Sequence, residues 1–245
     1  MNKKHRTTRW MIGSLLVLSL AACQPDPETE ETTESSITAA EITIEPVNLQ
    51  DQATIDAANG IFEDSQVADR PLSDWEGEWQ SVYPYLLDGT LDSVFTGKAE
   101  DTGEKTAEEY KEYYTIGYES TFTGLTITAD SITFYEGDTA RTGTYAYSGY
   151  QILTYESGKK GVRYLFERKD DAEAAPKYVQ FSDHIIEPTA SAHFHIYLGD
   201  DSHAAILEEM DNWPTFYPAG MDGDEIVEEM LHHSSVSRSA GAVLR

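Results

Sequence analysis

The sequence predicts an α+β fold built around an antiparallel β-barrel with flanking helices. From Phe122 to Gly199, short runs of β-branched and aromatic residues are separated by turn residues, which is the pattern of adjacent antiparallel strands. On both sides of this region apolar residues recur at helical spacing. About 185 to 195 residues take part, enough for one domain with a continuous core.

Two helices are expected ahead of the strands. The first spans residues 51–67, where apolar residues recur at helical spacing, although Gly60 weakens the pattern. The second begins at the N-cap residue Ser73 and is kinked or ended by Pro84. Its apolar stripe consists of Trp75, Trp79, Val82 and Tyr83.

Three further helices are indicated by their start signals. Thr106 and Glu109 match a capping box and precede a stripe of tyrosines. Near the end of the chain, residues 201–212 have a helical pattern. A last helix spans 222–233, where an acidic residue at each end of the first turn again fits a capping box.

The strand region predicts about seven strands with close turns, a meander that curls into a barrel. Asp130, Gly137-Asp138, Ser148-Gly149 and Ser157-Gly158 provide the turns. The strands are Leu125–Thr128, Ile132–Phe134, Thr144–Tyr147, Gln151–Tyr155, Val162–Phe166, Tyr178–Phe181 and the one that holds His193 and His195.

The N-terminal segment is interpreted as a lipoprotein signal peptide, residues 1–22. Four basic residues precede an apolar run that begins at Trp10 and is too short for a membrane-spanning helix of about 20 residues. The run ends in Leu20-Ala-Ala-Cys23, which looks like a bacterial lipobox, so Cys23 would become the lipidated first residue. The alternative is an ordinary signal peptide followed by a chance cysteine.

The remaining chain divides by composition. Residues 23–50 combine the lipidated cysteine with an acidic stretch rich in Thr and Ser, which predicts a disordered tether. Residues 51–235 form the predicted barrel domain, and 236–245 a C-terminal tail. The expected location is therefore extracytoplasmic, with the protein anchored to the bacterial cell membrane by its N-terminal lipid alone.

The charge of the chain favours cations as partners. The formal net charge is −27 at pH 7, which argues against binding to nucleic acid or to anionic lipid through a basic patch. Cys23 is the sole cysteine, so covalent catalysis by a barrel cysteine and an internal disulfide have no support.

Three histidines form the candidate metal site. His193 and His195 are two apart in a β-like stretch, so their side chains leave the sheet on the same face. Glu187–Ser191 has the composition of a hairpin turn, which would set His184 roughly opposite His193. Three neutral imidazoles with room for a fourth, exchangeable ligand are a standard zinc site. In an enzyme, such a zinc ion can activate a bound water.

Acidic residues nearby are candidates for the fourth ligand or for hydrogen bonding to the imidazoles, although any one of them is better explained as a surface turn acid. They are Asp183, Glu187, Asp200 and Asp201.

The remaining histidines of the domain have simpler explanations. His203 follows the acidic run as a surface residue at a helix start. His232 and His233 end the last helix, where histidine is favourable against the helix dipole, although either could contribute to a second, weaker site.

Several stretches of this sequence resemble the ZinT family over residues 51 to 233 or so, nearly the whole predicted domain. They are Asn59–Phe62, Leu72–Trp75, Trp79–Pro84, Gly149-Tyr150, Ile152–Tyr155, Ser157–Phe166, Lys177-Tyr178, Gln180–His184, His193–His195 and Asn212–Thr215.

The resemblance implies an extracytoplasmic zinc-binding protein with a lipocalin-like, calycin-type barrel. The family's three zinc-binding histidines fall on His184, His193 and His195. It further implies capture of zinc, and of cadmium or other divalent ions, with transfer to the substrate-binding protein of a zinc ABC importer. Where some members have a barrel cysteine pair this chain has Gly143 and Arg168, and an acidic tether replaces their His-rich segment.

The sequence is therefore interpreted as a lipid-anchored zinc-binding protein that is not an enzyme. Two alternatives remain open at this point. One is a lipocalin-like carrier of a small apolar ligand, in which the aromatic residues around Trp75 and Trp213 line a pocket. The other is a three-histidine zinc hydrolase, for which the sequence offers no particular general base.

Overall fold

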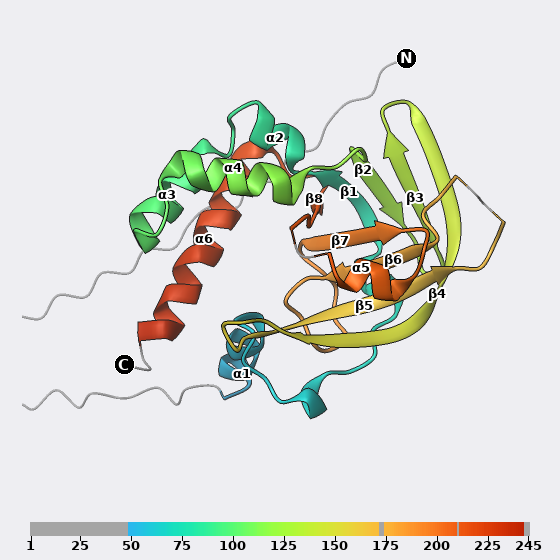
Figure 1. Ribbon diagram of the computed structural model, residues 1–245, viewed down its shortest axis with the longest axis horizontal. Helices are drawn as coiled ribbons and strands as arrows, with labels where there is room; N and C mark the ends of the chain where they lie inside the picture. The colour runs from blue at the N-terminus through green and yellow to red at the C-terminus, as the bar shows by residue number, and fades with distance from the viewer. Residues whose placement is uncertain (1–48, 172–173, 210, 243–245) are drawn as a thin grey trace, which may run out of the picture. The chain divides into compact units, whose positions relative to one another are not determined.

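Figure 1 shows the computed structural model, which describes residues 49–171, 174–209 and 211–242. These residues belong to one compact unit. The predicted signal peptide, Cys23 and nearly all of the tether lie outside the described residues and remain predictions. Within the described ranges, no helix has both the length and the apolar character needed to span a bilayer.

Eight antiparallel strands form a closed barrel in chain order, and the last pairs with the first. The α+β prediction and the barrel are confirmed, with one strand more than expected. The strands are β1 (Gly77–Ser81), β2 (Gly124–Ile127), β3 (Ser131–Glu136), β4 (Thr139–Thr154), β5 (Lys160–Arg168), β6 (Tyr178–Ser182), β7 (Phe194–Gly199) and β8 (Thr215–Pro218).

Helices flank the barrel, and in Figure 1 α2, α3, α4 and α6 gather on one side of it. Two short 3-10 helices, η1 (Asp64–Gln66) and η2 (Leu72–Trp75), precede β1. The α-helices are α1 (Leu49–Ala58), α2 (Tyr83–Leu87), α3 (Asp92–Thr102), α4 (Ala107–Tyr118), α5 (His203–Leu207) and α6 (Gly223–Ala242).

The expected helix from Ser73 through Tyr83 is wrong. The chain there forms η2, then strand β1, and helix begins again only at Tyr83. The four-residue spacing of Trp75 and Trp79 does bring them together, because the Trp79 indole nitrogen donates to the Trp75 carbonyl at 2.8 Å. Strand pairing on both sides of β1 closes the barrel and outweighs the local helical pattern.

Other boundaries differ in smaller ways. Ser148-Gly149 is a bulge inside the long strand β4, where the register shifts, and no turn forms there. The helix expected over 51–67 ends at Ala58, and the one over 201–212 is reduced to α5. Helix α6 continues to Ala242, past the domain boundary expected at residue 235.

The capping-box predictions are confirmed. The Thr106 hydroxyl accepts from the Glu109 amide at 3.2 Å, while the Glu109 carboxylate accepts from the Thr106 amide at 2.8 Å. Asp222 and Glu225 make the same reciprocal pair, at 2.9 and 3.0 Å, immediately before and within the first turn of α6.

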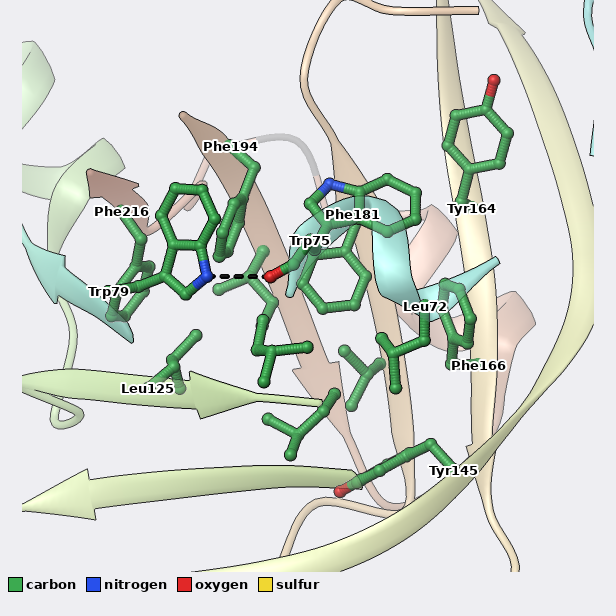
Figure 2. Packing of buried hydrophobic residues seen from close by; sticks show 14 of the residues in the cluster. Leu72, Trp75, Trp79, Leu125, Tyr145, Tyr164, Phe166, Phe181, Phe194 and Phe216 are labelled. Atoms are coloured by element: carbon green, nitrogen blue, oxygen red, sulfur yellow. Dashed lines mark hydrogen bonds between the residues drawn. The ribbon is translucent and has the colours of Figure 1, made fainter. Parts of the chain in front are cut away.

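The barrel interior is filled by aromatic and aliphatic side chains. Figure 2 shows Trp75 from η2 among them, stacked on Phe181 with ring centroids 4.8 Å apart. Phe166, Phe181, Phe194 and Trp75 are each at most 1% exposed. A second apolar cluster belongs to the helices, where residues of α2, α3, α4 and α6 pack together with Tyr217.

The two positions that the family resemblance matches to a cysteine pair lie side by side here. Gly143 and Arg168 are on the adjacent strands β4 and β5, and a Cβ at Gly143 would lie 3.0 Å from the Arg168 side chain. Arg168 forms an ion pair with Asp170 instead, at 3.6 Å.

Candidate metal site

The three predicted histidines converge at the end of β6 and the start of β7. His195 is in β7, His193 immediately precedes it, and His184 lies two residues beyond β6. The ring centroids are 5.5 Å apart for His184 and His195, 6.4 Å for His193 and His195, and 6.5 Å for His184 and His193.

These separations fit a metal ion after a small closure. With Zn–N bonds of about 2.0–2.1 Å, imidazole centroids around a tetrahedral zinc lie roughly 5.3 Å apart. No three His, Cys, Asp or Glu side chains in the described part of the chain already have the spacing of a formed metal site. The rings therefore need to close by at most about 1.2 Å, within the reach of side-chain rotation.

The strand register explains why His184 faces His193. β6 and β7 pair antiparallel with Ser182 opposite His195, so continuing that register would set His184 opposite His193. The expectation about these two residues holds, but the tight hairpin does not form. The ladder ends at Ser182, and residues 183–193 form a long loop that carries His184.

Arg70 holds this loop in place. It is completely buried, and its guanidinium donates to Asp183 at 2.7 Å, to Asp74 at 2.8 Å and to the Thr189 carbonyl at 2.8 Å. It also lies 4.2 Å from the centre of the Trp75 ring. Since Asp183 is the residue before His184, this network fixes the chain at the point where His184 leaves the barrel.

His184 has an unusual backbone conformation. Its φ is +63°, and it is the one residue other than glycine in the described ranges with a positive φ. The left-handed region is unfavourable for residues with a Cβ, by about 1–2 kcal/mol. The loop thus holds His184 against a local conformational preference, and such strain is concentrated at functional sites.

His195 is oriented by Thr215 of β8. Its Nδ1 lies 2.7 Å from the Thr215 hydroxyl, which donates to the Trp213 carbonyl at 3.0 Å. The hydroxyl therefore accepts from Nδ1–H, and Nε2 is left to bind a metal. Burial, with the neighbouring His184 and His193, lowers the pKa of His195 well below its usual value, so this imidazole is neutral.

The segment that supplies Thr215 is tied to α4. The Asn212 side-chain amide donates to the Ile116 carbonyl at 2.9 Å and to the Glu119 carbonyl at 3.0 Å, at the end of that helix. The Trp213 ring lies against Gly117, where a Cβ would come within 2.3 Å of it. Glycine at position 117 is thus required for the close approach that places Thr215 beside His195.

His193 is positioned by α6 and β8. Its ring stacks on Tyr217 with centroids 4.9 Å apart, and its Nδ1 lies 3.2 Å from a carboxylate oxygen of Glu229. Tyr217 donates its hydroxyl hydrogen to the same carboxylate, and burial together with Glu229 raises the pKa of Tyr217. The Glu229 carboxylate therefore lies beside Nδ1 of His193, and Nε2 is the nitrogen left for a metal.

The acidic candidates fall into different places. Asp183 is buried and binds Arg70, so it positions His184 through the loop. Glu187 is exposed on the loop. Asp200 and Asp201 follow the opposite end of β7, and Asp200 accepts from the Lys177 amide at 2.8 Å. The structure brings neither of these last two to the histidines.

The remaining histidine candidates are not brought to the cluster. His203 begins α5 and packs against Tyr178, with ring centroids 4.8 Å apart. His232 is exposed on α6, and the side chain of His233 lies outside those described. Sequence reasoning missed Glu229 and Thr215, since neither is near the histidines in the chain.

All three histidines line a cleft of about 870 Å³. Its walls come from α3, α4 and α6 on the helical side, and from the β4–β5 turn and the His184 loop on the barrel side. The histidines are thus reachable from solvent and can receive an ion.

A closed eight-stranded barrel with three convergent imidazoles in an open cleft defines a metal-binding protein of the lipocalin-like class. Sequence comparison identifies the family. The model of the ZinT family, described as periplasmic lipocalin-like zinc-recruitment proteins, matches residues 53–233, and the chain belongs to this family.

Relatives agree with this assignment. The chain is 48% identical to the probable metal-binding protein YrpE of Bacillus subtilis, over 91% of this chain and 95% of that protein. It is 51% identical to the zinc-binding lipoprotein AdcA of Streptococcus pneumoniae (strain TIGR4) over 78% of this chain, but spans only 38% of AdcA.

A solved structure shares the fold. The Zn(II)-bound ZinT-like domain of Streptococcus pneumoniae AdcA is 52% identical, with a TM-score of 0.70, covering 71% of this chain and 97% of that domain. In the structure of Zn(II)-bound AdcA from Streptococcus pneumoniae, the match covers 38% of the solved chain.

Proposed function

We propose that this protein captures Zn(II) outside the cytoplasm through His184, His193 and His195 and transfers it to the substrate-binding protein of a zinc ABC importer. The observation that carries the proposal is the convergence of the three rings, with centroids 5.5 to 6.5 Å apart, in a cleft open to solvent. Membership of a zinc-recruitment family supports zinc as the metal.

The supporting contacts favour binding over catalysis. Thr215 and Glu229 each contact the Nδ1 of one imidazole, an arrangement that fixes ring orientation and raises the affinity for a metal. With His184 on a loop and the fourth position left to water or another exchangeable ligand, the site suits capture and release. The relatives are named as metal-binding or zinc-binding proteins, which agrees with a role that is not enzymatic.

Calorimetric titration of the metal-free chain with zinc tests the proposal. One zinc per chain is expected, with a large loss of affinity in His193→Ala and no measurable binding when His193 and His195 are both replaced. His203→Ala is the matched control, because His203 is half-buried outside the cluster and its removal should leave affinity unchanged. Stoichiometric binding that survives the double replacement would exclude this site. Titration with cadmium in the same series tests whether it uses the same ligands.

The two alternative functions are less well supported. A carrier of apolar ligands needs an empty barrel, whereas this interior is packed with side chains such as Trp75 and Phe181 (Figure 2). A hydrolase needs a general base near the open metal position. The carboxylate that contacts a cluster histidine, Glu229, is already engaged with His193 and Tyr217. Hydrolysis of a test ester that stops when zinc is removed by a chelator would support the hydrolase alternative.

The location and the partner have their own tests. We propose lipid attachment at Cys23 to a bacterial membrane, which predicts that Cys23→Ala releases the protein from the membrane fraction. Transfer is tested by mixing the zinc-loaded protein with the importer's metal-free binding protein. Zinc should leave faster than it leaves to a small chelator of equal zinc affinity. Equal rates would contradict direct transfer.

A further inference from the structure

The cleft beside the histidines is much larger than a hydrated zinc ion needs. Its volume is about 870 Å³, within the range of about 300–1,000 Å³ that is typical of small-molecule sites. Aromatic side chains form much of its wall, among them Tyr113, Tyr155 and Tyr197. This space has no role in binding zinc alone.

The charges on the cleft are opposite to those of the whole chain. The formal net charge of the protein is −27, yet four cationic residues line the cleft against one acidic residue, Asp101. The cationic residues are Lys98, Lys159, Lys160 and Arg163. Such a local excess of positive charge attracts anions and opposes the entry of a bare divalent cation.

The four cations differ in their contacts, and Lys98 lies over the Tyr114 ring, 5.3 Å from its centre. Lys160 pairs with Asp64 at 2.7 Å, and Arg163 donates to the carbonyls of Ile206 and Glu209 beneath α5. In contrast, neither Lys98 nor Lys159 forms an ion pair with any described residue. Lys98 belongs to α3 and Lys159 to the β4–β5 turn, and both line the cleft.

An anion in the fourth position would stabilise the bound metal more than water does. Three neutral imidazoles leave the full double charge of Zn(II) in a partly desolvated site, and burial of uncompensated charge is costly. Glu229 compensates only through His193. An anionic group in the open coordination position would balance the metal charge directly.

We propose, on the basis of the zinc site above, that the cleft takes zinc together with a small chelator bearing several carboxylates. One carboxylate occupies the open position on the metal that the three histidines hold. The others pair with Lys98 and Lys159, while the tyrosine rings flank the carbon skeleton. The protein then captures a zinc complex, and the anion that accompanies the metal neutralises both the ion and the cleft.

Citrate is the probe, and the full chain loaded with zinc or with cobalt(II) is the protein. Calorimetry should show one citrate bound per zinc-loaded chain and none to the metal-free chain. In the cobalt form, citrate should shift the visible absorption bands because it enters the metal's coordination sphere. Lys98→Gln with Lys159→Gln should weaken citrate binding at least tenfold, without weakening zinc binding in the absence of citrate. The matched control is Lys169→Gln with Lys177→Gln, which removes two lysines that do not line the cleft.

The outcomes separate this inference from the proposed function. If zinc binds but citrate gives neither heat nor a spectral shift, or removes the metal, the inference is wrong and zinc capture stands. If inorganic phosphate binds as tightly as citrate, the cleft binds anions without selecting several carboxylates, and the chelator assignment is wrong. Absence of zinc binding itself would overturn the proposed function.

Discussion

The positive φ of His184 leads to a stability prediction that runs against usual expectation. The side chain is exposed and its φ is +63°, so replacement loses few contacts while the backbone strain remains for any residue with a Cβ. That strain costs about 1–2 kcal/mol, whereas glycine avoids it at an entropic cost of about 0.5–1 kcal/mol. His184→Gly should therefore be more stable than His184→Ala by roughly 0.5–1 kcal/mol.

The comparison has a built-in control at His193, where φ is not positive. There the order should reverse, with His193→Gly less stable than His193→Ala by about 0.5–1 kcal/mol. Urea unfolding of the four metal-free proteins in the presence of a chelator measures both differences, and the m-values should agree. In thermal unfolding, each kcal/mol corresponds to about 2–4 °C for a domain of this size. If His184→Ala is as stable as His184→Gly, the strain argument is wrong. All four variants should also lose zinc affinity.

Three further predictions concern the residues that support the histidines. Thr215→Val keeps the shape of a buried side chain but removes the acceptor for His195, so zinc affinity measured by competition should fall about 10- to 100-fold; unchanged affinity would exclude an orienting role. Arg70→Met leaves the Asp183 carboxylate buried without its cation and should cost about 3–5 kcal/mol of unfolding free energy, and Asp183→Asn added to that variant should recover part of the loss. Burial lowers the pKa of His203, against a smaller opposing effect of Glu167, so the unfolded state takes up its proton first as the pH falls below about 6.5. Unfolding free energy should therefore decrease from pH 7.5 to 5.5 more steeply in the wild type than in His203→Gln, and equal slopes would contradict this.

Local signals in the sequence were sufficient to single out the three candidate histidines and to predict much of the barrel. The alternation that places His193 and His195 on one face is a property of any strand, and β7 provides it. The capping boxes at Thr106 and Asp222 are equally local, since both partners lie within one turn. These predictions depend only on residues close together in the chain.

The largest error occurs where distant strands override a local pattern. Trp75 and Trp79 have helical spacing, but β1 gains hydrogen bonds from β2 and from β8, the latter far along the chain. Strand β8 itself was missed because it has only four residues, Thr215–Pro218, with little room for alternation. Its pairing with β1 is what closes the barrel.

The supporting contacts of the site could not be predicted for the same physical reason. A histidine is recognisable as a ligand from its own chemistry, whereas Thr215, Glu229 and Arg70 are ordinary residues until the fold sets them beside the cluster. Arg70 is 113 positions from Asp183, and Glu229 reaches His193 from the last helix. We expect metal affinity to depend on these distant residues as well as on the three histidines, because they contact the imidazoles or the backbone beside them. The candidate histidines can therefore be recognised from nearby residues in the chain, whereas the proposed affinity of the site depends on contacts that only the whole fold provides.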